Sequence, residues 1–424
     1  MKKIFTLALL IAAFFTSMTA QATLDTLTMG PNYSIQSWYK FETDKETKAP
    51  INNWDLAFTT KSADAGIFVN HAALLYRAAA PASAWATMTV DTAALLASGI
   101  QQVNTDTSWS VGALNRTQNN VFDFGWGNYS VVTHNVTGDS VYVMKAATDG
   151  KWRKFIIERL ALDTSYFVKI ANLDGTNPIS LEVKKGAYRG KNFGYYSFAT
   201  AAQLDREPLS KDWDVTVWRH WGLAADPTNG SIQSYLLTGF LQNHGTSVAK
   251  VIKRDTASDV FANQVFKSQI NTIGADWKTF LQATNVWKLA DSTAYFVKTA
   301  NGKIYKMIFT GFGGAGTGNA IFKRELVGQV TSTKVADDKI AALAVSPNPA
   351  TDGYFNIVYD FGKTPQQANF QLFNLAGQAV YTQKLQNTEG VQILQMPTLN
   401  LTNGVYLARL TFDGQSLVRK VVIQ

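Results

Sequence analysis

The chain has 424 residues, of which 46% are hydrophobic and 17% charged, with a formal net charge of +8 and no cysteine. This length exceeds one ordinary hydrophobic core, so we expect two or three domains. Disulfides, thiol catalysis and cysteine zinc sites are excluded. Lysine and arginine are scattered, with no basic run of five or more. The positive charge therefore favours solubility, and we predict no nucleic-acid partner.

Residues 1–22 have the features of a signal peptide. Lys2 and Lys3 precede an apolar run at residues 4–15, and an A-x-A cleavage site ends at Ala22. The apolar run is too short to span a bilayer comfortably, and no later segment approaches the length of a membrane span. We therefore predict an exported mature chain without a transmembrane segment.

A hairpin pattern occurs twice along the chain. VYVMKAATDGKWRKFII (residues 141–157) and AYFVKTANGKIYKMIF (residues 294–309) align with a single gap. Their Asp-Gly and Asn-Gly pairs are tight turns of type I′ preference between alternating strands. Upstream, WDLAF beginning at Trp54 corresponds to WDVTV beginning at Trp213. The pattern predicts a duplicated domain built mainly from antiparallel strands.

The repeat divides the exported chain into three predicted domains. Two tandem β-rich domains cover residues 23–191 and 192–330, although the strand around residues 193–198 could close the first domain or open the second. The polar residues 331–340 form a linker. Residues 341–424 contain short alternating strands between Asn-Pro, Asp-Gly and Asn-Gly turns, which is typical of a small Ig-like β-sandwich. The expected fold class is all-β, mainly antiparallel, with few short helices.

The third domain resembles the type A C-terminal sorting domain of the type IX secretion system of Bacteroidota. Besides FNLAG at residues 373–377 and LTNGVY at residues 401–406, the residues that carry the sorting motif are Ser346, Pro347, Asn348, Pro349, Gly404 and Tyr406. The resemblance implies a signal for secretion rather than a biochemical activity. It predicts the type IX secretion machinery as a partner, and a secreted or outer-membrane-surface location in a Gram-negative bacterium.

Residues 23–329 are similar to the HmuY-like family, exported β-rich proteins whose best-known members bind haem. The similarity rests on the two Trp-Asp strands and the two repeated hairpins, which are scaffold features of the fold. The resemblance implies non-covalent capture of haem or a related porphyrin. It also implies transfer of that ligand to an outer-membrane haem receptor.

Haem iron needs axial donors, and without cysteine these must come from histidine, methionine or tyrosine. The chain has four histidines, two in each repeat: His71, His134, His220 and His244. We expect His71 and His134 to form the first metal-ligand pair, and His220 with His244 the second. Their spacing from the Trp-Asp strands differs between the repeats, so identical sites are not expected. One site and two sites both remain open, with Met29 and Met88 as alternative donors.

No catalytic motif occurs in a fitting context, so we expect no enzyme activity. The remaining alternative to haem capture is a surface adhesin, or a module that binds glycans or proteins. Exposed tryptophan and tyrosine side chains in β-domains stack on sugars and fill protein pockets. The sequence therefore predicts an exported binding protein, with haem as the first ligand and a glycan or protein as the second.

Overall fold

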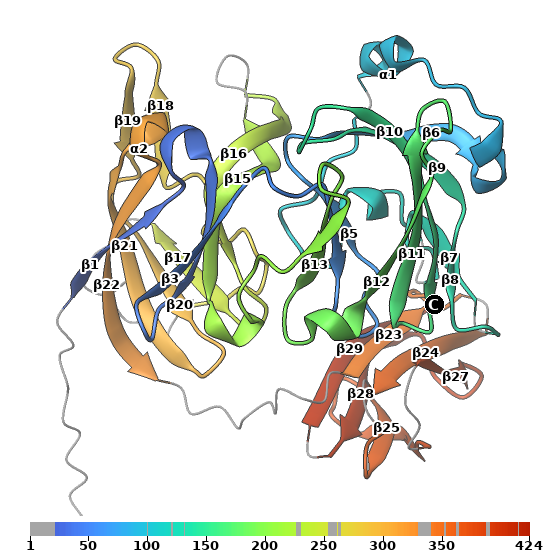
Figure 1. Ribbon diagram of the computed structural model, residues 1–424. Helices are drawn as coiled ribbons and strands as arrows, with labels where there is room; N and C mark the ends of the chain where they lie inside the picture. Colours follow the sequence, from blue (N-terminus) through green and yellow to red (C-terminus); the bar gives the residue numbers. More distant parts are fainter. Residues whose placement is uncertain are drawn as a thin grey trace, which may run out of the picture.

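The computed structural model describes residues 22–99, 101–119, 122–130, 132–225, 230–252, 261, 264–329, 341–351, 353–361, 364–386, 391–413 and 415–424. Strands dominate this part of the chain, and the only α-helices in it are the short α1 (Thr92–Ser98) and α2 (Gly314–Thr317) (Figure 1). The all-β prediction is confirmed. No helix among the described residues is long and apolar enough to cross a membrane. The predicted signal peptide and linker lie almost wholly outside the described residues.

The first unit consists of two antiparallel sheets around one core. Its larger sheet contains β6 (Leu74–Pro81), β7 (Gly127–Tyr129), β8 (Val136–Gly138), β9 (Ser140–Lys145), β10 (Trp152–Ala161), β11 (Ser165–Asn172) and β12 (Ile179–Lys184). Its smaller sheet contains β4 (Leu56–Thr59), β5 (Ile67–Val69), β13 (Phe193–Ser197) and β14 (Ala202–Leu204). Phe58 from the smaller sheet and Phe155 from the larger one meet in the core. Burial of these apolar faces stabilises the sandwich.

The second unit is built in the same way. One sheet contains β1 (Thr23–Thr28), β17 (Ser247–Ile252), β20 (Thr293–Lys298), β21 (Lys303–Phe312) and β22 (Asn319–Gln329). The other contains β2 (Ile35–Lys40), β3 (Lys45–Pro50), β15 (Val215–Ala225) and β16 (Ile232–Gln242), and a separate hairpin contains β18 (Lys278–Leu281) and β19 (Val286–Leu289). Val217, Phe240 and Tyr295 belong to the core between the sheets. The two repeated hairpins of the sequence are β9–β10 and β20–β21.

Strand order corresponds between the two units. The order β12-β11-β10-β9-β6 in the first matches β1-β22-β21-β20-β17 in the second, and β14-β13-β4-β5 matches β3-β2-β15-β16. In the first unit β12, β13 and β14 follow the hairpin along the chain. In the second unit their places are taken by β1, β2 and β3, so residues 23–50 close the second unit (Figure 1).

The predicted boundary between residues 191 and 192 does not coincide with the division between the sheets. Tyr196 on β13 pairs with Leu56 in the first unit, and Tyr39 on β2 pairs with Val215 in the second. Either aromatic strand could supply the same ladder of backbone hydrogen bonds to either Trp-Asp strand. Sequence similarity alone therefore does not identify which partner each strand takes.

The Trp-Asp turns are held identically in the two units. Asn70 donates its side-chain amide to the carbonyl oxygen of Trp54 at 2.9 Å, and Asn243 donates to that of Trp213 at 2.9 Å. The backbone N–H of each asparagine donates to the carbonyl oxygen of the aspartate after the tryptophan. Asn70-His71 and Asn243-His244 are therefore equivalent, contrary to the expectation from spacing that no histidine recurs.

The third domain forms two facing sheets, consistent with the predicted small β-sandwich. One contains β23 (Ala341–Ser346), β24 (Tyr354–Phe361) and β27 (Val391–Pro397), and the other contains β25 (Ala368–Phe373), β26 (Ala379–Lys384), β28 (Gly404–Phe412) and β29 (Gln415–Ile423). Asn348 accepts from the N–H of Val422 at 2.8 Å and donates to the carbonyl of Lys420 at 2.7 Å. Tyr406 donates its hydroxyl to the carbonyl of Thr402. These motif residues fasten the last strand and the turn before β28.

Candidate functional site

The structure brings His71 of the first unit next to the second unit. The indole Nε1 of Trp221 donates to the carbonyl oxygen of His71 at 3.1 Å. His71 and His220 are both buried, and the two imidazoles are close enough for the charge of His220 to act on His71. Burial lowers the pKa of each to about 4, so both are neutral at pH 7. Nδ1 of His71 and both ring nitrogens of His220 have no hydrogen-bond partner.

The other two predicted ligands lie in different environments. His134 is exposed in a turn at a φ of 55° and its Nδ1 hydrogen-bonds the hydroxyl of Tyr129 at 2.9 Å. Burial lowers the pKa of His244 to about 4, and the nearby Lys61 lowers it further. Lys61 follows Trp54 by seven residues, and His220 follows Trp213 by seven residues. Lys61 and His220 therefore occupy equivalent positions in the two units. The pair Lys61–His244 corresponds to the pair His220–His71. Among the described residues, no three or more acidic or histidine side chains could together hold a metal ion.

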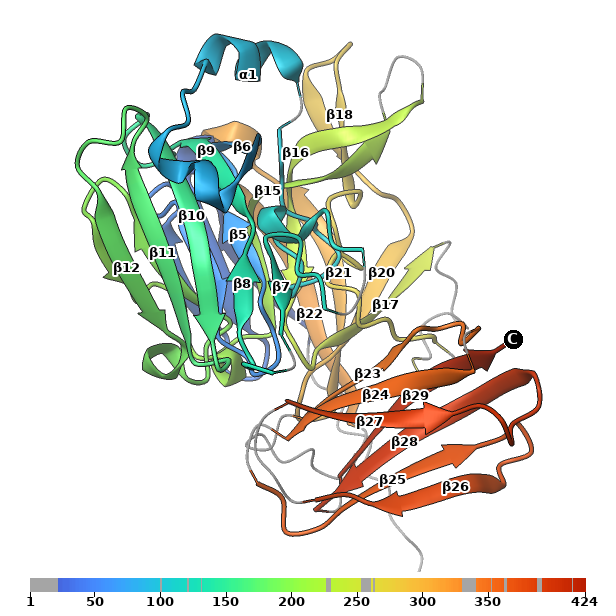
Figure 2. The same ribbon diagram turned by 90° about the vertical axis from the view of Figure 1, so that its right-hand side faces the viewer.

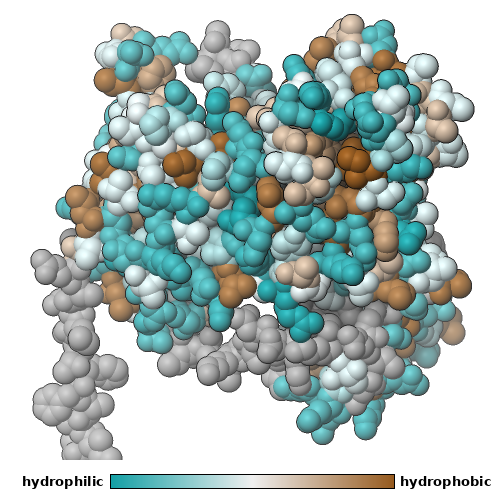
Figure 3. All heavy atoms as spheres, in the orientation of Figure 1, coloured by the Kyte–Doolittle hydropathy of each residue, from teal (hydrophilic) through white to brown (hydrophobic). Residues whose placement is uncertain are grey.

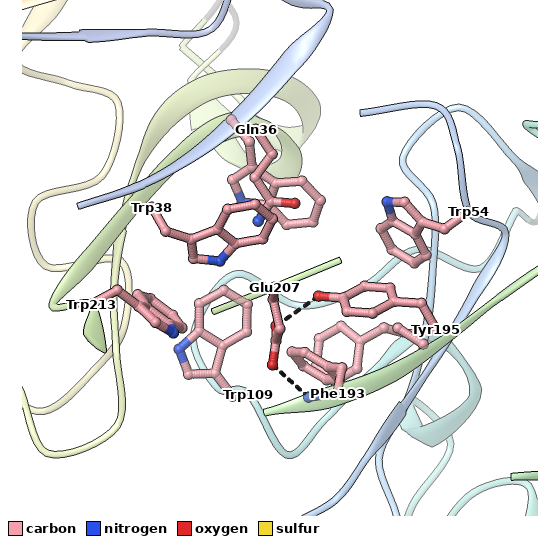
Figure 4. A pocket seen from close by; sticks show the side chains of 11 residues that line it. Gln36, Trp38, Trp54, Trp109, Phe193, Tyr195, Glu207 and Trp213 are labelled. Atoms are coloured by element: carbon pink, nitrogen blue, oxygen red, sulfur yellow. Dashed lines mark hydrogen bonds between the residues drawn. The ribbon is translucent and has the colours of Figure 1, made fainter. Parts of the chain in front are cut away.

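A cavity lies where the two units meet, and we call it the inter-unit cavity (Figure 4). Its volume is about 20 Å³. Its walls come from the smaller sheets of both units and from the segment containing Trp109: Gln36, Trp38, Trp54, Ala57, Phe68, Trp109, Phe193, Tyr195, Glu207, Trp213 and Trp218. Most of these residues belong to one buried aromatic cluster that joins the units. The equivalent tryptophans Trp54 and Trp213 lie on opposite sides of the space.

Two charged residues are buried at this cavity. The carboxylate of Glu207 stands in the middle of the aromatic side chains (Figure 4) and accepts from the Tyr195 hydroxyl and the Phe193 N–H, both at 2.8 Å. Burial raises the pKa of Glu207 to about 7. The guanidinium of Arg206 lies 5.0 Å from the ring centre of Tyr195 and 5.2 Å from that of Trp38. Sequence reasoning missed both residues, because they lie in a polar segment that resembles an exposed loop.

The inter-unit cavity does not fit a haem. Pockets for drug-sized ligands have volumes of about 300–1,000 Å³, whereas this cavity has about 20 Å³. His71 and His220 supply suitable donor atoms, but the aromatic side chains between the units are packed against one another, with Trp54 and Trp218 stacked at 6.3 Å. Histidine nitrogens that could coordinate iron are present there, but the space that a porphyrin ring needs is not.

A second candidate site lies on the surface, where two hairpins of the second unit project from its sheets, and we call it the hairpin end (Figure 2). It is defined by large apolar side chains that are 38–66% exposed on β15–β16 and β18–β19: Leu223, Ile232, Tyr235, Phe280, Leu281 and Val286. Residues 231–238 and 279–287 contain no charged residue. Figure 3 shows hydrophobic side chains at the projecting tip of β18–β19.

Ring contacts connect the bases of these hairpins. Arg219 of β15 lies over the ring of Tyr33, which stacks on Phe312 at 6.4 Å, and Phe312 meets Trp287 of β19 edge-on at 5.0 Å. The hairpins therefore rise from the same end of the second unit. β22 begins beside this end and has 11 residues, so at about 3.3 Å per residue it ends about 35 Å away. Gln329, the last described residue before the third domain, therefore lies at the far end.

Comparison with known proteins identifies the third domain. A family model described as a secretion system C-terminal sorting domain matches residues 344–424. The chain carries a sorting domain. The protein is therefore exported through the type IX secretion machinery, to the cell surface or into the medium, as predicted. All six predicted motif residues, from Ser346 to Tyr406, lie inside the matched range.

The comparisons do not identify residues 23–329. No curated protein matches the chain. One solved structure, a tomographic subvolume average of the EFF-1 fusogen on extracellular vesicles, is 7% identical and covers 96% of this chain and 92% of its own, with a TM-score of 0.16. A likeness this weak carries no argument. The similarity of residues 23–329 to the HmuY-like family stays a prediction.

Proposed function

We propose that this exported protein is a non-enzymatic binding module that holds a neutral polysaccharide at the hairpin end. The observation that carries the proposal is the set of exposed aromatic and aliphatic side chains on two hairpins whose residues 231–238 and 279–287 carry no charge. Tyr235 is 58% exposed and Phe280 is 40% exposed, although both are large enough to favour burial. Clusters of exposed apolar side chains are typical of interaction sites.

The chemistry of the hairpin end favours an uncharged sugar chain. Aromatic side chains present a flat apolar face together with polar edges, and the apolar C–H face of a sugar ring stacks on such a surface. Hydroxyl and amide side chains alternate with the apolar ones, among them Ser234 and Asn285. Such groups can exchange hydrogen bonds with sugar hydroxyls. No lysine or arginine lies within residues 231–238 or 279–287. Of the cations elsewhere on these strands, Arg219 lies over the ring of Tyr33 and Lys288 pairs with Asp291, so neither favours a phosphate or sulfate at the exposed apolar side chains.

The orientation of the hairpin end suits surface display. Gln329, the last described residue before the sorting domain, lies about 35 Å from the hairpins, by the length of β22. A molecule tethered through its third domain would keep the hairpin end clear of the tether. The same surface would be equally free in a released form.

Haem capture and an outer-membrane haem receptor are what the HmuY-like resemblance implies. Two features count against placing haem in the described part of the chain. The histidines of the predicted first pair lie in different environments, and the cavity beside His220 and Trp218 has a volume of about 20 Å³. Hemin is therefore the control ligand in the experiment that follows.

The experiment titrates the full mature chain with soluble neutral polysaccharides and follows the heat of binding. Tyr235→Ala and Phe280→Ala should each weaken binding at least tenfold, because each removes a stacking face. Tyr354→Ala, which removes a tyrosine 39% exposed in the sorting domain, is the matched control and should bind as the wild type does. Binding that survives both hairpin variants contradicts the proposal. A saturable shift of the Soret absorption band on titration with hemin would favour haem as the ligand over a polysaccharide.

A further inference from the structure

We propose that the inter-unit cavity is a binding site for one small monovalent anion of about the size of chloride. This inference is independent of the hairpin end. It rests on unpaired indole donors of residues that line the cavity, on the buried charges beside it and on its volume. The donors and the positive charge point to an acceptor-only ligand, and the volume limits its size.

Three tryptophans that line the cavity have an indole donor without an acceptor. The indole Nε1 atoms of Trp54, Trp213 and Trp218 are buried and have no hydrogen-bond partner, although all three residues line the cavity. An indole N–H can only donate, and a buried donor without an acceptor is destabilising. Trp109 shows the contrast, since its Nε1 donates to the carbonyl oxygen of Gln242 at 2.8 Å. A halide satisfies several donors at once.

A buried positive charge stands beside these donors. Arg206 donates to Asn53, Gln36 and the carbonyl of Pro50 at 3.1, 2.7 and 2.9 Å, and all three partners are neutral. Within the described part of the chain it forms no ion pair, although it is only 9% exposed. Its guanidinium carbon lies 5.7 Å from the ring centre of Trp54, a wall of the cavity. When Glu207 is protonated, its carboxyl no longer offsets the charge of Arg206. A buried guanidinium without a counter-charge is destabilising, so an anion is then favoured.

The protonation state of Glu207 controls whether the anion binds. Its ionised carboxylate would repel an anion and pair with Arg206, whereas its protonated form removes that repulsion. Burial raises the pKa of Glu207 to about 7, so the proton is available in mildly acidic solution. The other groups that face the carboxyl are the Tyr195 hydroxyl, with a pKa raised by burial, and Arg206. Anion uptake should therefore be coupled to uptake of one proton.

Other charged and titratable groups lie near this carboxyl. Lys191 donates to the main-chain carbonyl of Glu207 and pairs with Asp205 at the surface. His220 stacks on Trp218 at 6.1 Å and has a pKa lowered to about 4, so it stays neutral above pH 5.5. Lys278, whose charge acts on His220, has a pKa lowered to about 7 by burial, so a pH dependence between pH 5.5 and 8.5 is assigned to Glu207 only where Glu207→Gln removes it.

The volume sets the selectivity. A water molecule needs a cavity of about 10–15 Å³, and this one has about 20 Å³. A monatomic anion close to water in size fits, whereas nitrate, acetate and sulfate do not. Chloride and bromide should therefore bind, and the polyatomic anions should not.

The test measures the thermal midpoint of the full mature chain in sodium chloride, bromide, acetate and sulfate at matched ionic strength, at pH 5.5 and 8.5. Chloride and bromide should raise the midpoint by a few degrees, saturably, at pH 5.5 and not at pH 8.5. Glu207→Gln should make the halide effect equal at the two pH values. Trp213→Phe should reduce it, and Trp85→Phe, which removes an indole from a separate partly buried cluster, should leave it intact.

Equal midpoints in all four salts at pH 5.5 would overturn the proposal and leave the cavity to a water molecule. A halide effect that Trp213→Phe and Glu207→Gln leave unchanged would also overturn it, because the anion would then bind elsewhere. A crystal grown in bromide provides a readout that does not depend on stability. Anomalous density in the cavity supports the assignment, and density without anomalous signal contradicts it.

Discussion

Replacing Glu207 with glutamine should change how stability depends on pH. The carboxyl of Glu207 is fully buried and accepts hydrogen bonds from two backbone N–H groups and the Tyr195 hydroxyl. Burial outweighs these bonds and raises its pKa from 4.5 to about 7. The folded chain therefore holds this proton more tightly than the unfolded chain does. Glutamine keeps the size and one carbonyl acceptor but does not titrate.

The sign and magnitude follow from linkage. Between pH 4.5 and 7 the folded state binds more protons at this site than the unfolded state, so the stability that Glu207 contributes is fully present below pH 4.5 and is lost as pH rises through 7. Each pKa unit corresponds to about 1.36 kcal/mol, and the change from 4.5 to about 7 gives about 3 kcal/mol. The glutamine variant should therefore gain about 3 kcal/mol over the wild type between pH 4.5 and pH 8.

The assay is urea unfolding of the full chain in halide-free buffer at half-unit steps from pH 4.5 to 8.5, with tryptophan fluorescence as the signal. The difference between variant and wild type cancels the contributions of other buried carboxyls, such as Asp55 and Asp214. Superimposable pH profiles for the two proteins would refute the assignment of this buried proton to Glu207.

Three further results are expected. Asn70→Ala and Asn243→Ala should each lower the free energy of unfolding in urea by about 2–4 kcal/mol, because each leaves two backbone carbonyls without a donor. A decrease below about 0.5 kcal/mol in either variant, as is usual for a surface substitution, would contradict the equivalence of the two asparagines. Deleting residues 23–50 should destabilise the second unit, because it exposes the edges of β15 and β22. Light scattering should then detect aggregation. A soluble monomer would contradict the conclusion that β1, β2 and β3 complete the sheets of the second unit. Burial lowers the pKa of Lys278 to about 7, so the free energy of unfolding of the wild type should increase as pH rises from 7 to 10.5. Lys278→Met should lack this increase in the same urea assay. The same pH dependence of stability in both proteins would contradict the lowered pKa of Lys278.

Local patterns in the sequence predict the local structure well. The alternating strands, the Trp-Asp motifs and the turns at Asp-Gly and Asn-Gly appear where they were expected. Each depends on neighbouring residues only, such as the positive φ of Gly150 in the first hairpin turn. The predicted two-residue type I′ geometry is wrong, because only the glycine of each pair has a positive φ and the paired strands end at Lys145 and Trp152 in the first hairpin. The sorting motif is equally local, since Asn348 and Tyr406 fasten elements of their own domain.

Pairing between distant segments could not be predicted in the same way. β2 pairs with β15 although about 175 residues separate them, and nothing in the sequence distinguishes this partner from β4. The recurrence of Asn-His was hidden by strand length. β15 and β16 have 11 residues each, whereas β4 and β5 have 4 and 3, so Asn243 follows Trp213 by 30 residues and Asn70 follows Trp54 by 16.

The candidate sites were predicted least well. Arg206 and Glu207 have no periodic or motif signal, because their burial results from the packing of two sheets that are distant in sequence. The exposed side chains of the hairpin end look like ordinary strand residues, and only the structure shows that nothing in the described part of the chain covers them. The histidines attracted attention as rare donors, yet their positions depend on the same long-range pairing.

The most direct test of the proposed function is isothermal titration of the full mature chain with a panel of neutral polysaccharides, with Tyr235→Ala and Tyr354→Ala measured in parallel. The account predicts saturable binding that Tyr235→Ala weakens at least tenfold and Tyr354→Ala leaves unchanged. Absence of binding across the panel, or equal affinity in both variants, would contradict a polysaccharide site at the hairpin end.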